Sequence, residues 1–213
     1  MKGKSKLENK QAKISSRNVA LAVIRHNSTQ DQQSISTETA LKAANKIVKV
    51  AEKAKINWAL AGGLAMHFYG FTRATKDVDL VASGLLNLPS VMSLSFGGET
   101  YEVKVGRKTI KVDWIVRADF FREFYENALR DCLEDEKGLR YLTPEWMVIL
   151  KYIAGRGKDQ IDLMWLLQQT DLVDRQLVCK LMIEVLGDKG AALPVRELER
   201  LFAQADLNKL RDE

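Results

Sequence analysis

Two aspartates one residue apart, Asp77 and Asp79, are the first residues in the chain that could do chemistry. On a strand, residues i and i+2 point to the same face, so the two carboxylates would lie side by side and repel each other. A divalent cation relieves that repulsion, and Mg²⁺ suits oxygen ligands that it can share with substrate phosphates. Apolar Val78, Leu80 and Val81 indicate a buried strand. The sequence therefore predicts a Mg²⁺ site, with Mn²⁺ as the alternative metal. A solvated strand end without a ligand is the other interpretation.

A glycine pair, Gly62-Gly63, lies between a short apolar run and a short helical pattern. Glycines at such a point let the backbone approach a ligand closely. The N-terminus of the following helix would offer free N–H groups and a positive dipole end to a phosphate. Taken alone, however, the pair is better explained as a plain tight turn.

The combination of these features is more informative than either one. An apolar residue, Gly62-Gly63, thirteen intervening residues and then Asp77-Val78-Asp79-Leu80 resemble the signature of the polymerase-beta-like nucleotidyltransferase superfamily. The resemblance implies that the glycine turn binds phosphate and that the Asp-x-Asp strand binds metal. It also implies a third carboxylate on a later strand of the same sheet.

Asp113 stands where the resemblance requires that third carboxylate, within the apolar segment 109–116. Three carboxylates can hold two metal ions roughly 4 Å apart, one activating the attacking hydroxyl and one holding the triphosphate. Asp113 is thus predicted to act on the acceptor side. The alternative is a structural ion pair with Lys104 or Lys111.

The string Arg-Ala-Thr-Lys-Asp-Val-Asp, which starts at Arg73, resembles strings in the abortive-infection (AbiEii/AbiGii) branch of the superfamily. Arg73 is predicted either to hold a phosphate or to orient Asp77 or Asp79. Thr75 shares the strand face of these aspartates by parity. It is predicted either to hydrogen-bond a carboxylate or simply to favour the strand.

A block that begins at Lys151, Lys-Tyr-Ile-Ala-Gly-Arg-Gly-Lys-Asp-Gln-Ile-Asp-Leu, also resembles that branch. The resemblance implies that Lys151 meets nucleotide phosphates and that Asp162 helps to shape the site. Lys151 shares a helix face with Met147 and Ala154, so it is predicted to point inward, where a lysine needs an anionic partner. A snorkelling surface lysine is the alternative. Asp159 reads as a helix N-cap, and the helix dipole is a sufficient structural reason for Asp162.

Hydrophobic periodicity and turn residues define the elements that must position these side chains. The predicted strands span 56–61, 78–81, 102–105 and 109–116, with a hairpin turn at Gly106-Arg107. The predicted helices span about 36–51, 64–69, 117–133, 143–155, 159–169, 174–187 and 194 to the end. The fold class is therefore α/β (α+β), a small mixed sheet with a C-terminal helical bundle, and the resemblance implies nucleotidyltransferase topology.

The predicted organisation has three parts: a basic, mostly disordered tail over 1–35 with a short helix near 19–24, a nucleotidyltransferase core over 36–135, and a helical part over 136–213 packed on the core. The net charge of +5 arises entirely from residues 1–17, and the rest of the chain carries equal numbers of basic and acidic side chains. The basic pI therefore arises from the N-terminal tail, and it gives no support to nucleic-acid binding by the rest of the chain. The tail is either a solvated leader or a contact to RNA.

The chain has no run of eighteen apolar residues, and its basic N-terminus lacks the apolar core of a signal peptide. Cys132 and Cys179 are predicted to be buried thiols, with one disulfide as the alternative. A cytoplasmic protein without a membrane partner is expected.

The predicted function is Mg²⁺-dependent transfer of a nucleotidyl group from an NTP such as ATP to a hydroxyl or phosphate acceptor. The resembled branch implies a toxin of a toxin–antitoxin pair, with RNA or protein as acceptor and an antitoxin protein as partner. The alternatives are a small-molecule (antibiotic-type) nucleotidyltransferase and a catalytically silent nucleotide- or partner-binding module. The predicted catalytic and metal-binding residues are Asp77, Asp79 and Asp113. The predicted nucleotide-binding residues are Gly62, Gly63, Arg73, Lys151 and Asp162.

Overall fold

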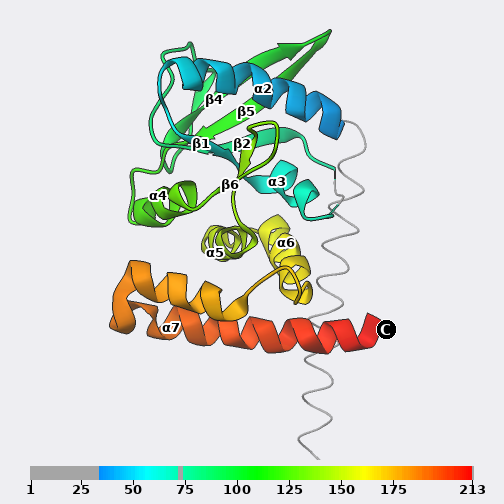
Figure 1. Ribbon diagram of the computed structural model, residues 1–213, viewed down its shortest axis with the longest axis vertical. Coiled ribbons are helices and arrows are strands. Elements are labelled where there is room, and N and C mark those ends of the chain that lie inside the picture. The colour runs from blue at the N-terminus through cyan, green and yellow to red at the C-terminus, as the bar shows by residue number, and fades with distance from the viewer. Residues whose placement is uncertain (1–33, 72–73, 213) are drawn as a thin grey trace, which may run out of the picture.

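The structure, a computed structural model, describes residues 34–71 and 74–212 (Figure 1). The predictions made for residues 1–33, including the short helix near 19–24, lie outside the described residues. So does the prediction for Arg73.

A seven-stranded sheet forms the upper part of the molecule in Figure 1, with the strand order β3-β4-β5-β2-β1-β7-β6. Its strands are β1 (Trp58–Leu60), β2 (Asp77–Ala82), β3 (Met92–Ser93), β4 (Gly98–Val105), β5 (Lys108–Ile115), β6 (Leu133–Glu134) and β7 (Arg140–Tyr141). The sheet is mixed, because β2 pairs with β5 and β1 pairs with β7 in parallel, whereas the other pairs are antiparallel. This confirms the predicted fold class, a mixed sheet combined with helices.

Alternation along β5 shows how the sequence divides the two faces of the sheet. Ile110, Val112 and Trp114 are buried, and the residues between them face the other way. Helix α2 (Thr37–Lys53) covers the apolar face, packing on β2, β4 and β5. Its N-cap is Ser36, at the predicted start of the helix, and the Ser36 hydroxyl accepts the Thr39 N–H at 3.3 Å.

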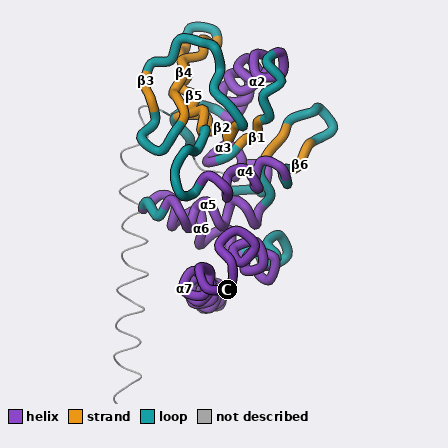
Figure 2. Tube along the Cα trace, turned by 90° about the vertical axis from the view of Figure 1, so that its left-hand side faces the viewer, coloured by secondary structure: helices purple, strands orange, loops and turns teal. Residues whose placement is uncertain are grey.

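The other face of the sheet looks toward the remaining helices: α3 (Gly62–Phe68), α4 (Arg122–Arg130), α5 (Pro144–Ala154) and α6 (Gly157–Gln168). Figure 2 shows α5 and α6 between the sheet and the C-terminal helical segment. Helix α5 is capped by the Thr143 hydroxyl, which accepts the Trp146 N–H at 3.3 Å, and it ends at Gly155, as the sequence predicted.

Helix α7 (Arg175–Asp212) is interrupted at Gly187, where φ is 68° and ψ is 164°. The chain reverses there, and the two halves lie side by side, joined by an ion pair between Arg175 and Asp206 at 2.6 Å (Figure 1). The predicted break at Gly187 is confirmed. The predicted start of the last helix at Pro194 is wrong, because Pro194 lies inside this helix. A proline lacks only one N–H donor, so packing can offset its cost in a helix.

Two further differences concern the segment between the sheet and α5. The helix predicted for 117–133 is shorter, since α4 begins at Arg122 after a turn in which Arg117 pairs with Asp119 at 2.5 Å. Strands β6 and β7 were not predicted. Each has only two residues, too few to show a periodicity.

Within the described ranges, no helix combines the length and apolar character needed to cross a membrane. Cys132 and Cys179 are both free thiols, and both are half-buried, so the predicted full burial is not reached.

Candidate functional site

The glycine turn lies directly against the Asp79 carboxylate. Gly62 has a φ of +56°, and a Cβ atom added there would stand only 1.8 Å from Asp79 Oδ2. The backbone of Ala61 donates to the Asp79 carbonyl at 2.9 Å, which fixes the turn to strand β2. Both the backbone angle and the lack of space exclude a side chain at this position. Asp79 can therefore occupy its observed position only if residue 62 is glycine.

The three predicted aspartates share one face of the sheet. Asp79 on β2 pairs in register with Asp113 on the parallel strand β5, and Asp77 precedes Asp79 by two residues. Neighbours in register point to the same side, as do residues i and i+2 of one strand. This face is opposite the one that α2 covers. The structure thus brings together the carboxylates of two strands that are distant in sequence.

Asp113 is held by a residue that the sequence reading missed. The buried Thr100 on β4 donates its hydroxyl to Asp113 Oδ1 at 2.7 Å. The alternative of an ion pair with Lys104 or Lys111 is not observed, since Asp113 makes no ion pair anywhere in the described chain. A signal for Thr100 was present: counting outward from the Gly106 turn pairs Thr100 with Asp113.

Burial and mutual repulsion make two of these carboxylates harder to ionise. Burial raises the pKa of Asp79, and the neighbouring charge of Asp77 raises it further, against the opposing charges of Lys158, Lys151 and Arg156. Burial also raises the pKa of Asp113, where the Thr100 hydrogen bond opposes the rise and the Asp79 charge adds to it. A bound cation would favour the ionised form of both groups.

The donor chemistry of this face fits Mg²⁺, because the side chains offered are carboxylates. In the part of the chain that the structure describes, however, no group of three or more His, Cys, Asp or Glu side chains is arranged to hold a metal ion. Mg²⁺ usually takes one or two carboxylates from the protein and completes its shell with water and substrate phosphates. The aspartates therefore fit a Mg²⁺ ion that arrives with a ligand better than a permanently held one.

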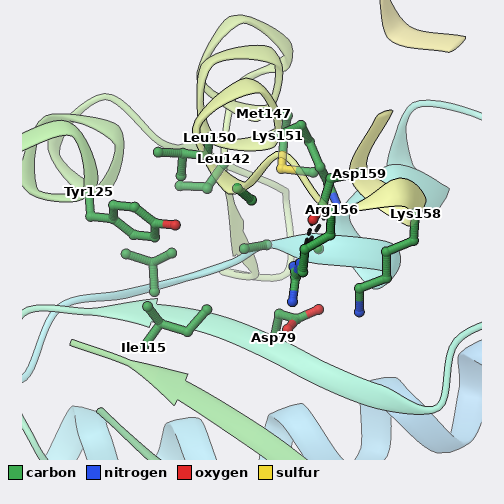
Figure 3. A pocket seen from close by; sticks show the side chains of 14 residues that line it. Asp79, Ile115, Tyr125, Leu142, Met147, Leu150, Lys151, Arg156, Lys158 and Asp159 are labelled. Carbon is green, nitrogen blue, oxygen red and sulfur yellow. Dashed lines mark hydrogen bonds and ion pairs between the residues drawn. The ribbon is translucent and has the colours of Figure 1, made fainter. Parts of the chain in front are cut away.

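A pocket separates this face from α5 and α6, with Gly62 and Asp79 on the sheet side and Lys151 on the helix side (Figure 3). Lys151 is only 6% exposed. Its ammonium lies 2.8 Å from Asp159 Oδ1 and 2.7 Å from Asp162 Oδ2, and both aspartates are fully buried. The prediction that Lys151 points inward to an anionic partner is confirmed, and the snorkelling alternative is wrong.

Asp159 is not the N-cap that the sequence predicted. Helix α6 begins two residues earlier, at Gly157, with Arg156 in the cap position and no side-chain cap. Instead, Asp159 accepts hydrogen bonds from Lys151 and from Arg156 Nε, the latter at 2.5 Å. Burial alone would raise the pKa of Asp159, but the hydrogen bond from Arg156 and the charge of Lys151 together hold it below its usual value.

Two cations of the pocket were not predicted as site residues. Arg156 and Lys158 line it, and Figure 3 shows both side chains extending from α6 toward Asp79. Tyr125 from α4 lines the same pocket. Thr75, which was predicted either to bond a carboxylate or only to favour the strand, donates its hydroxyl to the backbone carbonyl of Asp77 at 2.9 Å. It supports the strand rather than the carboxylates.

No protein-family model matches the chain, and no curated protein sequence is similar to it. Solved structures that resemble it include an antigenic nucleotidyltransferase-like protein from Paracoccidioides brasiliensis, at 13% identity and a TM-score of 0.44, covering 80% of this chain and 95% of that one. The antibiotic-resistance factor ANT(2'')-Ia has 15% identity and a TM-score of 0.37, covering 83% of this chain and 100% of that one. At these identities and TM-scores the likeness is coarse.

Proposed function

We propose that the protein is a Mg²⁺-dependent nucleotidyltransferase that moves a nucleoside monophosphate from an NTP to a hydroxyl or phosphate acceptor, releasing pyrophosphate. The observation that carries this proposal is the pairing of Asp79 with Asp113 in register on parallel strands, with the Gly62 turn packed against Asp79. The geometry places carboxylates from two strands beside a turn that only glycine can form.

In this proposal Asp77 and Asp79 would hold the Mg²⁺ ion that accompanies the NTP. The bound metal would polarise the phosphoryl group and offset its negative charge. Asp113 serves the acceptor. Its Oδ1 accepts the Thr100 hydroxyl, so Oδ2 is the atom that would receive the proton of an attacking hydroxyl. The nucleotide-binding roles of Gly62, Gly63, Arg73, Lys151 and Asp162 remain predictions.

The charge of the pocket bears on the acceptor. Its lining includes Lys151, Arg156 and Lys158 besides the carboxylates of Asp79 and Asp159. An aminoglycoside acceptor is a polycation and would need an acidic lining, whereas the lining of this pocket carries both signs of charge. A toxin that modifies RNA or protein, kept in check by an antitoxin, is the form of the proposal that the resemblance in the sequence favours.

The proposal is tested by incubating the protein with each labelled NTP in turn, with Mg²⁺, and with total RNA or no added acceptor. Wild-type protein should incorporate label, and Asp77→Ala should not. Asp188→Ala, which removes an exposed aspartate from α7, is the matched control and should retain activity. Equal incorporation by wild-type protein and Asp77→Ala would exclude the assigned site. Chelation by EDTA should abolish the reaction.

A further inference from the structure

We infer that Arg156 and Lys158 form an anion-binding pair for the terminal phosphates of the nucleotide, and that Lys151 positions Arg156 through Asp159 without meeting the nucleotide itself. The identity of the anion as part of an NTP rests on the proposed function. The existence of the pair rests on the contacts of α5 and α6.

The ammonium of Lys151 is already bound by carboxylates of the protein. It lies within 2.8 Å of one carboxylate oxygen on Asp159 and one on Asp162, and its side chain is nearly inaccessible. With a buried carboxylate on each side, the charge of this ammonium is already balanced by groups of the protein. Lys151 therefore neutralises buried acid, and a triphosphate gains little from it directly.

Arg156 contacts Asp159 from the solvent side, opposite the buried Lys151. Its Nε donates to Asp159 Oδ2 at 2.5 Å and its Nη2 approaches Asp159 Oδ1 at 3.4 Å, so one edge of the guanidinium is fixed to a carboxylate that Lys151 holds. The Arg156 side chain is nevertheless 58% exposed. A guanidinium has five donors in a rigid fork, so the outer edge remains available to a phosphate.

Lys158 supplies the second charge. It is half-buried, lines the pocket, and in Figure 3 extends toward the same space as Arg156. Throughout the described residues it makes no ion pair with any carboxylate. A half-buried ammonium without such a partner is stabilised by an anionic ligand.

The two walls of the pocket carry opposite charges, and this favours a polyphosphate. The carboxylates of the sheet would repel a triphosphate unless a metal ion intervened, whereas the basic pair attracts it. A polyphosphate bridged by Mg²⁺ satisfies both walls at once. A nucleic-acid backbone is a poorer candidate, because the chain beyond residue 17 has no net positive charge.

The test measures binding of inorganic tripolyphosphate in the presence of Mg²⁺ by titration calorimetry. The double variant R156M/K158M keeps the apolar stems and removes both charges. We expect its dissociation constant to rise at least tenfold, equivalent to about 1.4 kcal/mol. The matched control is Lys180→Met, at an exposed lysine of α7 that lies 3.7 Å from Glu184, and it should bind like wild type. Circular dichroism checks that the variants are folded.

Equal affinity of wild type and R156M/K158M would overturn the inference, and so would the absence of any binding by the wild-type protein. Arg156→Lys should lose part of the affinity, because a lysine cannot hold Asp159 and a phosphate with one planar fork. The transfer assay separates the two proposals. If the protein transfers no nucleotide but tripolyphosphate binding depends on Arg156 and Lys158, the anion-binding pair is supported and the proposed nucleotidyltransferase activity is wrong. If the protein transfers nucleotide and R156M/K158M keeps the wild-type KM and the wild-type affinity for tripolyphosphate, the anion-binding pair is wrong and the nucleotidyltransferase activity is supported.

Discussion

Asp113 lies beside Asp79 on the neighbouring parallel strand and is held from its other side by the hydroxyl of Thr100. The three residues form a row across β4, β5 and β2. One oxygen of Asp113 is therefore fixed by a buried neutral donor, and the orientation of the whole carboxylate is set by the hairpin that joins β4 to β5.

Replacing Thr100 with valine should lower kcat while leaving KM for the nucleotide nearly unchanged. Valine keeps the volume and removes only the donor, and a hydrogen bond to a charged group contributes about 1.5–3 kcal/mol, or roughly 10- to 100-fold in rate. Thr100→Ser retains a hydroxyl and should recover most of the activity in steady-state assays. Wild-type activity in Thr100→Val would mean that the hydroxyl has no role beyond packing.

Gly62→Ala should remove activity and also destabilise the fold. The new Cβ would overlap Asp79 Oδ2, so the carboxylate must move, and a positive φ costs a non-glycine residue about 1–2 kcal/mol. Urea unfolding and the transfer assay measure the two effects. Gly84→Ala is the control, because an added Cβ there would meet only Ile56 Cγ1 at 4.0 Å. The prediction fails if both alanine variants behave alike.

Asp79→Asn should stabilise the protein at neutral pH when divalent cations are chelated. Folding raises the pKa of Asp79, so the unfolded chain loses this proton at a lower pH than the folded protein does. At a pH above the ordinary aspartate range, ionisation of Asp79 therefore lowers the free energy of unfolding. The stabilising effect should be absent below about pH 4, the ordinary aspartate range, and should grow as the pH rises through the elevated pKa. Thermal unfolding in EDTA across this range provides the measurement. A less stable Asn variant at pH 7 would contradict the prediction.

Lys151→Met should destabilise the protein by about 3–5 kcal/mol, because it leaves two buried carboxylates without the ammonium that lies between them. The loss should shrink in acid, where Asp159 can be protonated. Lys42→Met provides the comparison. It breaks an exposed ion pair with Glu38 at 2.6 Å, which solvent screens, so the change in stability should be far smaller than for Lys151→Met. Denaturant unfolding of both variants at two pH values decides between them.

Local signals in the sequence predicted much of the sheet. The β4–β5 hairpin follows from a glycine turn between two alternating segments, and the caps of α2 and α5 follow from Ser36 and Thr143. Each of these features depends on residues close together in the chain. The register of Asp79 with Asp113 is different, since it depends on two strands that are distant in sequence. The family resemblance implies a third carboxylate on a later strand of the same sheet, but it does not specify the register.

The helix side of the pocket was harder to predict. Lys151 and Asp162 were identified, but the cap assigned to Asp159 was wrong, and Arg156 and Lys158 were passed over as site residues. An aspartate in the first turn of a helix looks the same in sequence whether it caps the helix or pairs with a buried lysine. Only the packing of α6 against α5 distinguishes the two, and that packing is a long-range property.

Strand β7 has a mechanical consequence for the pocket. It pairs with β1 through Leu60 and Tyr141, the Leu142 N–H donates to the Leu60 carbonyl at 3.0 Å, and the chain then runs directly into α5. The sheet wall and the helix wall are thus joined by backbone hydrogen bonds beside the glycine turn. An opening of the pocket that keeps these hydrogen bonds would pivot at this junction. Arg156 at the N-cap of α6 and Lys158 in its first turn would then travel farther than the residues next to β7.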